Sequence, residues 1–126
     1  MKISLLIFLL SLLGLLTGCV NDAGDTAGHW QTISSEQARD MMLESEEFVL
    51  LDVRTLWEFE MGHIEGAILI PYDQIRYMAV SELMDKRVPI FVYCQSGRRS
   101  SIAANTLAEL GYFNVYDFGG IIDWIW

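Results

Sequence analysis

The sequence contains few cysteines and few basic residues, and both shortages exclude classes of function. Its two cysteines are Cys19 and Cys94, so it has no C-x-x-C pair for a thioredoxin-type redox couple and no cysteine–histidine cluster for zinc. Lysine and arginine together number 8 against 17 acidic residues, and the formal net charge is −9. This charge argues against nucleic acid and against electrostatic binding to anionic lipid, and it also repels an anionic substrate. We therefore predict neither a metal site nor a nucleic-acid partner.

The first residues do not have the pattern of a folded domain. Lys2 precedes a leucine-rich apolar stretch over 3–16, which leads into Leu16-Thr17-Gly18-Cys19. A basic residue, a short apolar stretch and a small-residue site in this order are typical of a signal peptide. The last four residues resemble the lipobox of bacterial lipoproteins, which implies cleavage before Cys19 and a lipid on Cys19.

This pattern predicts a signal peptide over 1–18, a flexible tether over 19–28 and one folded domain over 29–126. We expect an exported protein anchored in a membrane through its lipid, at the periplasmic face or the outer cell surface. An uncleaved transmembrane helix is the alternative. However, the apolar stretch is short for a span of about 20 residues, and no basic residues follow it to stop transfer through the membrane. Because a lipidated Cys19 has no free thiol, we expect Cys94 to be free rather than paired in a disulfide.

Apolar runs alternate with helical patterns through the rest of the chain. Such alternation predicts an α/β fold with a parallel sheet flanked by helices on both faces. The run over 67–70 is interpreted as a buried strand, and Ser34 with Gln37 fits a capping box. The expected strands cover 29–33, 48–51, 67–70, 89–93 and 114–118, and the expected helices cover 34–44, 57–61, 75–84 and 100–110.

Cys94 is the candidate nucleophile because it ends an apolar strand and opens a tight loop before a helix. Ligands of parallel sheets bind beyond the carboxyl ends of the strands, which is where Cys94 falls. Backbone N–H groups in such a loop, together with the N-terminus of the following helix, stabilise an anion such as a thiolate. The candidate loop consists of Gln95, Ser96, Gly97, Arg98, Arg99 and Ser100.

Several motifs, in one order, resemble the rhodanese-like family of single-domain sulfurtransferases over nearly all of 30–124. They are Leu51-Asp52-Val53-Arg54, Trp57-Glu58-Phe59, Gly62-His63-Ile64-Glu65-Gly66-Ala67, Val92-Tyr93-Cys94, Gly111-Tyr112 and Gly119-Gly120. The resemblance implies that Cys94 accepts a sulfane sulfur, becomes a persulfide and passes the sulfur to a thiophilic acceptor. It implies no metal and no organic cofactor.

The resemblance also suggests roles for charged residues. Arg98 or Arg99 is expected to hold the oxyanion part of thiosulfate through paired N–H donors, unless one of them is solvated or paired with a carboxylate. Such arginines would make a local positive site in an acidic protein. Asp52 and Arg54 are interpreted as structural support for the loop rather than as a catalytic couple. His63 is interpreted as a hydrogen-bonded structural residue, because sulfur transfer from a preformed thiolate needs no base.

The donor is expected to be thiosulfate, a polysulfide or a persulfide, and the acceptor a thiol, cyanide or a protein thiol partner. A first alternative is a non-catalytic sulfur carrier or binding module that uses the same pocket. A second alternative is a cysteine phosphatase or arsenate reductase of related architecture. Those enzymes use Cys-x5-Arg, whereas here Ser100 occupies the position of that arginine and Arg99 comes one residue too early.

Overall fold

The computed structural model describes residues 28–126, and the predicted signal peptide, most of the tether and Cys19 lie outside them. A five-stranded sheet with the order β1-β5-β4-β2-β3 forms the centre of this part. All four strand pairs are parallel, so every strand ends at the same edge of the sheet. The strands are β1 (Trp30–Thr32), β2 (Val49–Asp52), β3 (Ile68–Leu69), β4 (Ile90–Cys94) and β5 (Val115–Gly120).

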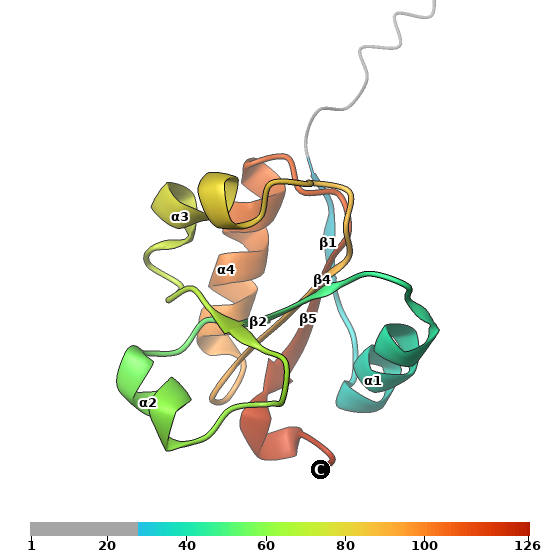
Figure 1. Cartoon of the computed structure of the whole chain (residues 1–126), viewed down its shortest axis with the longest axis vertical. Helices are drawn as coiled ribbons and strands as arrows, with labels where there is room; N and C mark the ends of the chain where they lie inside the picture. Colours follow the sequence, from blue (N-terminus) through green and yellow to red (C-terminus); the bar gives the residue numbers. More distant parts are fainter. Residues whose placement is uncertain (1–27) are drawn as a thin grey trace, which may run out of the picture.

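Helices cover both faces of the sheet, which confirms the predicted α/β architecture (Figure 1). The apolar residues of α3 and α4 pack on one face, with Ile75, Ala103 and Leu107 fully buried. On the other face α1 places Ala38 in a second cluster with Phe91 and other apolar side chains. The helices are α1 (Ser35–Glu44), α2 (Leu56–Met61), α3 (Ile75–Glu82) and α4 (Arg98–Glu109), followed by a 3-10 turn, η1 (Ile121–Asp123).

Side-chain caps fix where two of the helices begin. The Ser34 side chain accepts from the Gln37 N–H at 3.1 Å and the Gln37 side chain accepts from the Ser34 N–H at 2.9 Å, so the predicted capping box is confirmed. Thr55 and Glu58 form a second capping box at the start of α2. Each box satisfies backbone donors that the first turn of a helix leaves without partners.

The predicted strand over 67–70 was too long, and its burial was wrong. β3 has two residues, and Ile68 is 41% exposed. The Ala67 N–H donates to the Ile64 carbonyl oxygen in a turn, so the chain joins the sheet only at Ile68. Because β3 pairs with β2 alone, it is an edge strand. A continuous apolar run in the sequence does not distinguish an edge strand from a central strand.

Most other boundaries differ from the sequence prediction by one or two residues, and two of these differences bear on the candidate loop. Helix α4 begins at Arg98 rather than at 100, because Gly97 at its N-cap has φ 107 and turns the chain into the helix early. Arg98, Arg99 and Ser100 therefore belong to the first turn of α4 rather than to the loop. Strand β5 continues to Gly120 instead of ending at 118, and this extension brings the two glycines beside the Cys94 loop.

Neither a membrane-spanning helix nor a metal-binding cluster is found within residues 28–126. None of the helices there combines the length and apolar character needed to cross a membrane. No group of three or more His, Cys, Asp or Glu side chains in this range is arranged to hold a metal ion.

Candidate active site

Cys94 is the last residue of β4 and sits in the middle of the sheet, at the edge where all strands end. Every residue of β4 is buried, and Cys94 is 1% exposed. Its thiol is free, and the Gly97 N–H donates to Cys94 Sγ at 3.0 Å. The sulfur thus has a backbone donor directed at it and lies at the N-terminus of α4, where the helix dipole favours negative charge.

The glycine pair of β5 allows the loop to lie directly on the sheet. The register of β4 and β5 shifts between Val92, opposite Asp117, and Cys94, opposite Gly120. A Cβ on Gly120 would lie 2.3 Å from the Gln95 carbonyl oxygen and 2.7 Å from Ser96 Cα. No side chain fits at such distances, so the backbone approach of loop and strand requires glycine at position 120.

Ser100 closes the loop from within the first turn of α4. It is fully buried, and its Oγ donates to the Gly97 carbonyl oxygen at 3.0 Å. Gly119 contributes a second carbonyl oxygen at 3.4 Å from the same hydroxyl. The sixth position after the cysteine, where a cysteine phosphatase carries its arginine, therefore holds a small buried hydroxyl that binds the backbone.

Asp52 and Arg54 form a buried ion pair that reaches the loop. Arg54 Nη2 donates to Asp52 Oδ2 at 2.8 Å and to the Gly62 carbonyl oxygen at 2.7 Å, and Arg54 Nη1 donates to Gln95 Oε1 at 3.3 Å. Burial disfavours the charged guanidinium, but the hydrogen bonds and the charge of Asp52 outweigh this effect, and the pKa of Arg54 is raised. The pair joins the end of β2, the end of α2 and the side chain that follows Cys94.

Arg99 is paired with a carboxylate of α2. Its Nη1 and Nη2 donate to the two oxygens of Glu58, each at 2.8 Å, and both side chains are 21% exposed. The hydrogen bonds with Arg99 are the main cause that lowers the pKa of Glu58 to about 2. The same hydrogen bonds raise the pKa of Arg99, with smaller contributions from the charges of Glu58, Cys94 and Asp52.

The two predicted oxyanion-binding arginines therefore differ in their surroundings. Arg99 has its charge balanced by Glu58, which is the carboxylate pairing expected as the alternative for one of the two. Arg98 is exposed and makes no ion pair with any residue of the described part. Gln95 is partly buried and Ser96 is exposed, so the loop is accessible from its outer side.

His63 lies outside this set of contacts. Its ring stacks on Phe59 with centroids 3.7 Å apart, and its Nδ1 lies 2.8 Å from the Phe59 carbonyl oxygen. The hydrogen-bonded position expected for His63 is confirmed.

Sequence reasoning gave no role to Glu58, Tyr93 or Gly120. The buried Tyr93 hydroxyl accepts from the Ile64 N–H at 3.1 Å, and burial raises the pKa of Tyr93. The Thr55-x-x-Glu58 spacing could have revealed the capping box of α2. Nothing in the sequence pointed to Arg99 as the second partner of Glu58, 41 residues away.

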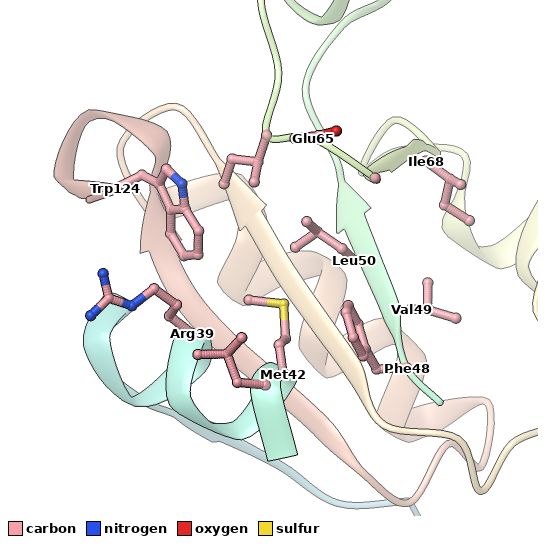
Figure 2. Close-up of a pocket in the computed structure, with 11 residues that line it drawn as sticks. Arg39, Met42, Phe48, Val49, Leu50, Glu65, Ile68 and Trp124 are labelled. Carbon is pink, nitrogen blue, oxygen red and sulfur yellow. The ribbon is translucent and has the colours of Figure 1, made fainter. Parts of the chain in front are cut away.

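A mostly apolar hollow lies on the opposite face of the sheet from the cluster that contains Cys94. It measures about 570 Å³ and lies between α1, the start of β2 and Trp124. Figure 2 shows Phe48, Leu50 and Trp124 among its mostly apolar lining. Neither Cys94 nor any loop residue lines it. This hollow is therefore separate from the candidate site at Cys94.

The fold and the loop together define a class of protein: α/β domains with a free cysteine at the carboxyl end of a central parallel strand. The family model of the rhodanese-like domain matches residues 34–125 of this chain. The chain belongs to the rhodanese-like family.

Relatives within this family carry out more than one reaction. The chain is 36% identical over 73 residues to the thiosulfate sulfurtransferase PspE of Escherichia coli K12, a match that covers 58% of this chain and 70% of that protein. It is 34% identical over 112 residues to the tRNA uridine(34) hydroxylase of Yersinia pestis, covering 85% of this chain but only 31% of that longer protein. Family membership therefore supports a sulfurtransferase-type enzyme without naming the substrate.

Solved structures agree with the fold. A rhodanese with anions from E. coli superposes with a TM-score of 0.57 at 35% identity, covering 60% of this chain and 88% of that one. A rhodanese-like domain protein from Staphylococcus aureus gives a TM-score of 0.65 at 30% identity, covering 75% and 91%.

Proposed function

We propose that the protein is a sulfurtransferase in which Cys94 carries the transferred sulfur as a persulfide. The observation that carries this proposal is the free Cys94 thiol at the strand end, with the Gly97 N–H 3.0 Å from its sulfur. A fixed donor at this distance stabilises a thiolate before transfer and needs no reorganisation during it. The similarity to a thiosulfate sulfurtransferase over most of that protein's length supports the same chemistry.

With thiosulfate as the donor, the Cys94 thiolate attacks the outer sulfur. The bond between the two sulfur atoms of thiosulfate breaks, its electron pair leaves on sulfite, and Cys94 becomes a persulfide anion. A thiophilic acceptor such as cyanide then attacks the outer sulfur of the persulfide, thiocyanate leaves, and the thiolate is restored. No proton moves and charge is conserved in both steps, so neither a general base nor a cofactor is required.

Polysulfides and persulfides fit the same two steps as donors, and a small thiol or a protein thiol fits as acceptor. Each donor supplies a sulfur atom bonded to a leaving group. Each acceptor supplies a nucleophile that attacks the outer sulfur of the persulfide. The hydrogen bond from the Gly97 N–H acts on the Cys94 sulfur itself, so it serves all of these donors and acceptors alike.

The contacts of Ser100 argue against phosphatase or arsenate reductase activity. Phosphoryl transfer needs an arginine that holds the oxygens of a tetrahedral anion. At the corresponding position Ser100 instead donates to the Gly97 backbone inside the protein. We expect negligible hydrolysis of an aryl phosphate, and efficient hydrolysis that disappears in Cys94→Ser would contradict the sulfurtransferase assignment.

Intact-mass measurement of the purified full-length chain tests the proposal directly. Incubation with thiosulfate should add the mass of one sulfur atom to the wild type and nothing to Cys94→Ser. Subsequent cyanide should remove this mass and release thiocyanate over many turnovers. Stable loading without turnover would instead favour the carrier alternative, and absence of loading by thiosulfate, polysulfide and persulfide alike would refute both.

We also propose that the protein is exported and held at a membrane by a lipid on Cys19. Support comes from the order of Lys2, the apolar stretch and the Leu16-Thr17-Gly18-Cys19 motif in the sequence. The donor and acceptor would then be molecules outside the cytoplasm.

A further inference from the structure

The charge balance around the Cys94 loop conflicts with a doubly charged substrate. The whole chain carries a formal charge of −9, and the reacting thiolate adds a negative charge at the point of attack. Thiosulfate is a dianion, so its approach is opposed about twice as strongly as that of a monoanion of similar size. A site for thiosulfate therefore needs uncompensated positive charge near the sulfur.

Arg98 and Arg99, both in the first turn of α4, are the cations placed to supply that charge, and Glu58 compensates Arg99. Arg99 stands in the first turn of α4, five residues after Cys94, and the charge of Cys94 contributes to its raised pKa. Its two terminal nitrogens are both bound by the Glu58 carboxylate. The pair as a whole is neutral, and a neutral pair attracts an anion much less than a free guanidinium does.

Glu58 is itself held firmly in this position. Besides Arg99, its Oε2 accepts from the Thr55 N–H at 3.0 Å and from the Thr55 Oγ1 at 2.9 Å. These contacts belong to the cap of α2. The carboxylate therefore has fixed partners on both sides, and an incoming anion would have to break two charged hydrogen bonds to replace it.

We propose that Glu58 is a specificity-determining residue that makes this site favour sulfane-sulfur donors with a single negative charge over thiosulfate. This inference rests on the proposed sulfurtransferase function. The favoured class includes organic thiosulfonates, R–SO₂–S⁻, and other donors whose reacting end carries one charge. Arg98, exposed and outside any ion pair in the described residues, remains as the one uncompensated cation of the loop and its helix turn.

The same bonds form and break with both donors. The donors differ in charge and in leaving group, and of these two differences a substitution at Glu58 acts on the response to charge. The Cys94 thiolate attacks the outer sulfur of methanethiosulfonate, the sulfur–sulfur bond breaks, and methanesulfinate leaves with the electron pair. Two negative charges enter this step and two leave it. With thiosulfate, three enter and three leave, with sulfite as the leaving group. A change at Glu58 should therefore act on the ratio of the two rates.

Steady-state thiocyanate formation measures that ratio, with cyanide as acceptor and the full-length chain as enzyme. The quantity is kcat/KM for thiosulfate divided by kcat/KM for methanethiosulfonate. We expect the wild-type ratio to lie below one. In Glu58→Gln the ratio should rise roughly threefold to tenfold, because Arg99 becomes an uncompensated cation and a dianion gains about twice as much from it. Glutamine still accepts from Thr55, so the cap of α2 is kept.

Two partner variants separate charge from a structural effect. Arg99→Gln leaves Glu58 uncompensated and should lower the ratio below that of the wild type. The double variant Glu58→Gln with Arg99→Gln restores a neutral pair and should return the ratio to the wild-type value. Opposite shifts in the two single variants are not expected from a general loss of folding.

Glu109→Gln is the matched control. It removes the carboxylate of another ion pair of α4, the exposed pair with Arg76, and so makes the same change in net charge. Glu109 lies ten residues after Arg99, about 15 Å further along the helix. Its ratio should equal that of the wild type.

The possible outcomes distinguish the role of Glu58 from the sulfurtransferase function on which it rests. A wild-type ratio above one, or a ratio that stays constant or falls in Glu58→Gln while both donors are turned over, would overturn the role of Glu58 and leave the sulfurtransferase proposal standing. Failure of the wild type to transfer sulfur from either donor would refute the sulfurtransferase proposal and the inference together.

Discussion

Gly120 lies directly against the backbone of Gln95, and the space between them has no room for a methyl group. A Cβ at position 120 would stand 2.3 Å from the Gln95 carbonyl oxygen. Since Gln95 follows Cys94, this contact sets how closely the Cys94 loop lies on β5. The second glycine of the pair thus shapes the candidate site although it has no side chain.

We expect Gly120→Ala to displace the loop and to impair sulfur loading. The added methyl group overlaps backbone atoms, which cannot move aside as a flexible side chain does, and overpacking of this kind costs about 1 to 3 kcal/mol. Thermal unfolding and the rate of persulfide formation by intact mass measure the two effects.

Gly66→Ala is the matched control for this change. Gly66 has φ 85, and no atom lies within 4 Å of the place where a methyl group would stand, so alanine there adds backbone strain without touching the loop. It should lower stability but leave the loading rate per folded molecule near that of the wild type. Equal loading rates in Gly120→Ala and the wild type would contradict the role of the contact.

Replacement of Arg54 by methionine should destabilise the fold strongly. Asp52 is fully buried, and without Arg54 its charge has no compensating partner, which typically costs about 3 to 5 kcal/mol. Urea denaturation measures the loss. Arg87→Met removes an exposed ion pair with Asp85 instead and should change the free energy of unfolding by less than about 1 kcal/mol. Similar losses in the two variants would show that the buried pair does not brace the protein.

Acid should weaken the fold partly through Glu58. Its pKa is about 2 in the folded protein, against an ordinary value of 4.5. Because the folded value is the lower one, the stabilisation from the ionised carboxylate is complete above pH 4.5 and is lost as the pH falls towards 2. The loss is on the order of 2 to 3 kcal/mol for a shift of this size.

Comparison with Glu58→Gln isolates this contribution from the other carboxylates. The difference in unfolding free energy between the wild type and the variant should shrink as the pH falls from 6 to 2.5. A difference that stays constant over this range would mean that Glu58 keeps its ordinary pKa in the folded state.

The proposed lipidation of Cys19 predicts a clear result in cells. The wild type expressed in a bacterium should incorporate labelled palmitate and sediment with membranes. Cys19→Ser should incorporate none, whereas Cys94→Ser should be labelled as the wild type is. Label in Cys19→Ser would rule out this cysteine as the site of lipidation.

The sequence predicted the central features of the fold because each depends on local pattern. Continuous apolar runs separated by helical segments predict buried parallel strands, and the position of Cys94 after the run over 89–93 places the thiol at a strand end. The Ser34 capping box was predicted for the same reason, since its two partners lie three residues apart. Local patterns did not predict β3 correctly, because burial at a sheet edge depends on what the rest of the chain places there.

The contacts that tune the site were beyond local pattern. Glu58 and Arg99 meet across 41 residues, as do Arg54 and Gln95. Their meeting requires the parallel pairing of β2 with β4, which brings the ends of the two strands to one edge. Two arginines in sequence therefore suggested an oxyanion site, whereas the fold gives one of them a carboxylate partner.

The parallel sheet also gives the domain two unlike poles. Trp30 in β1 is in register with Val115 and, through it, with Ile90 at the beginning of β4, whereas Cys94 is the final residue of that strand. The chain thus enters the sheet at one pole and exposes its reactive loop at the other. An attachment through the residues before β1 would leave the sulfur-bearing pole outermost, in reach of partners that diffuse freely in the surrounding solution.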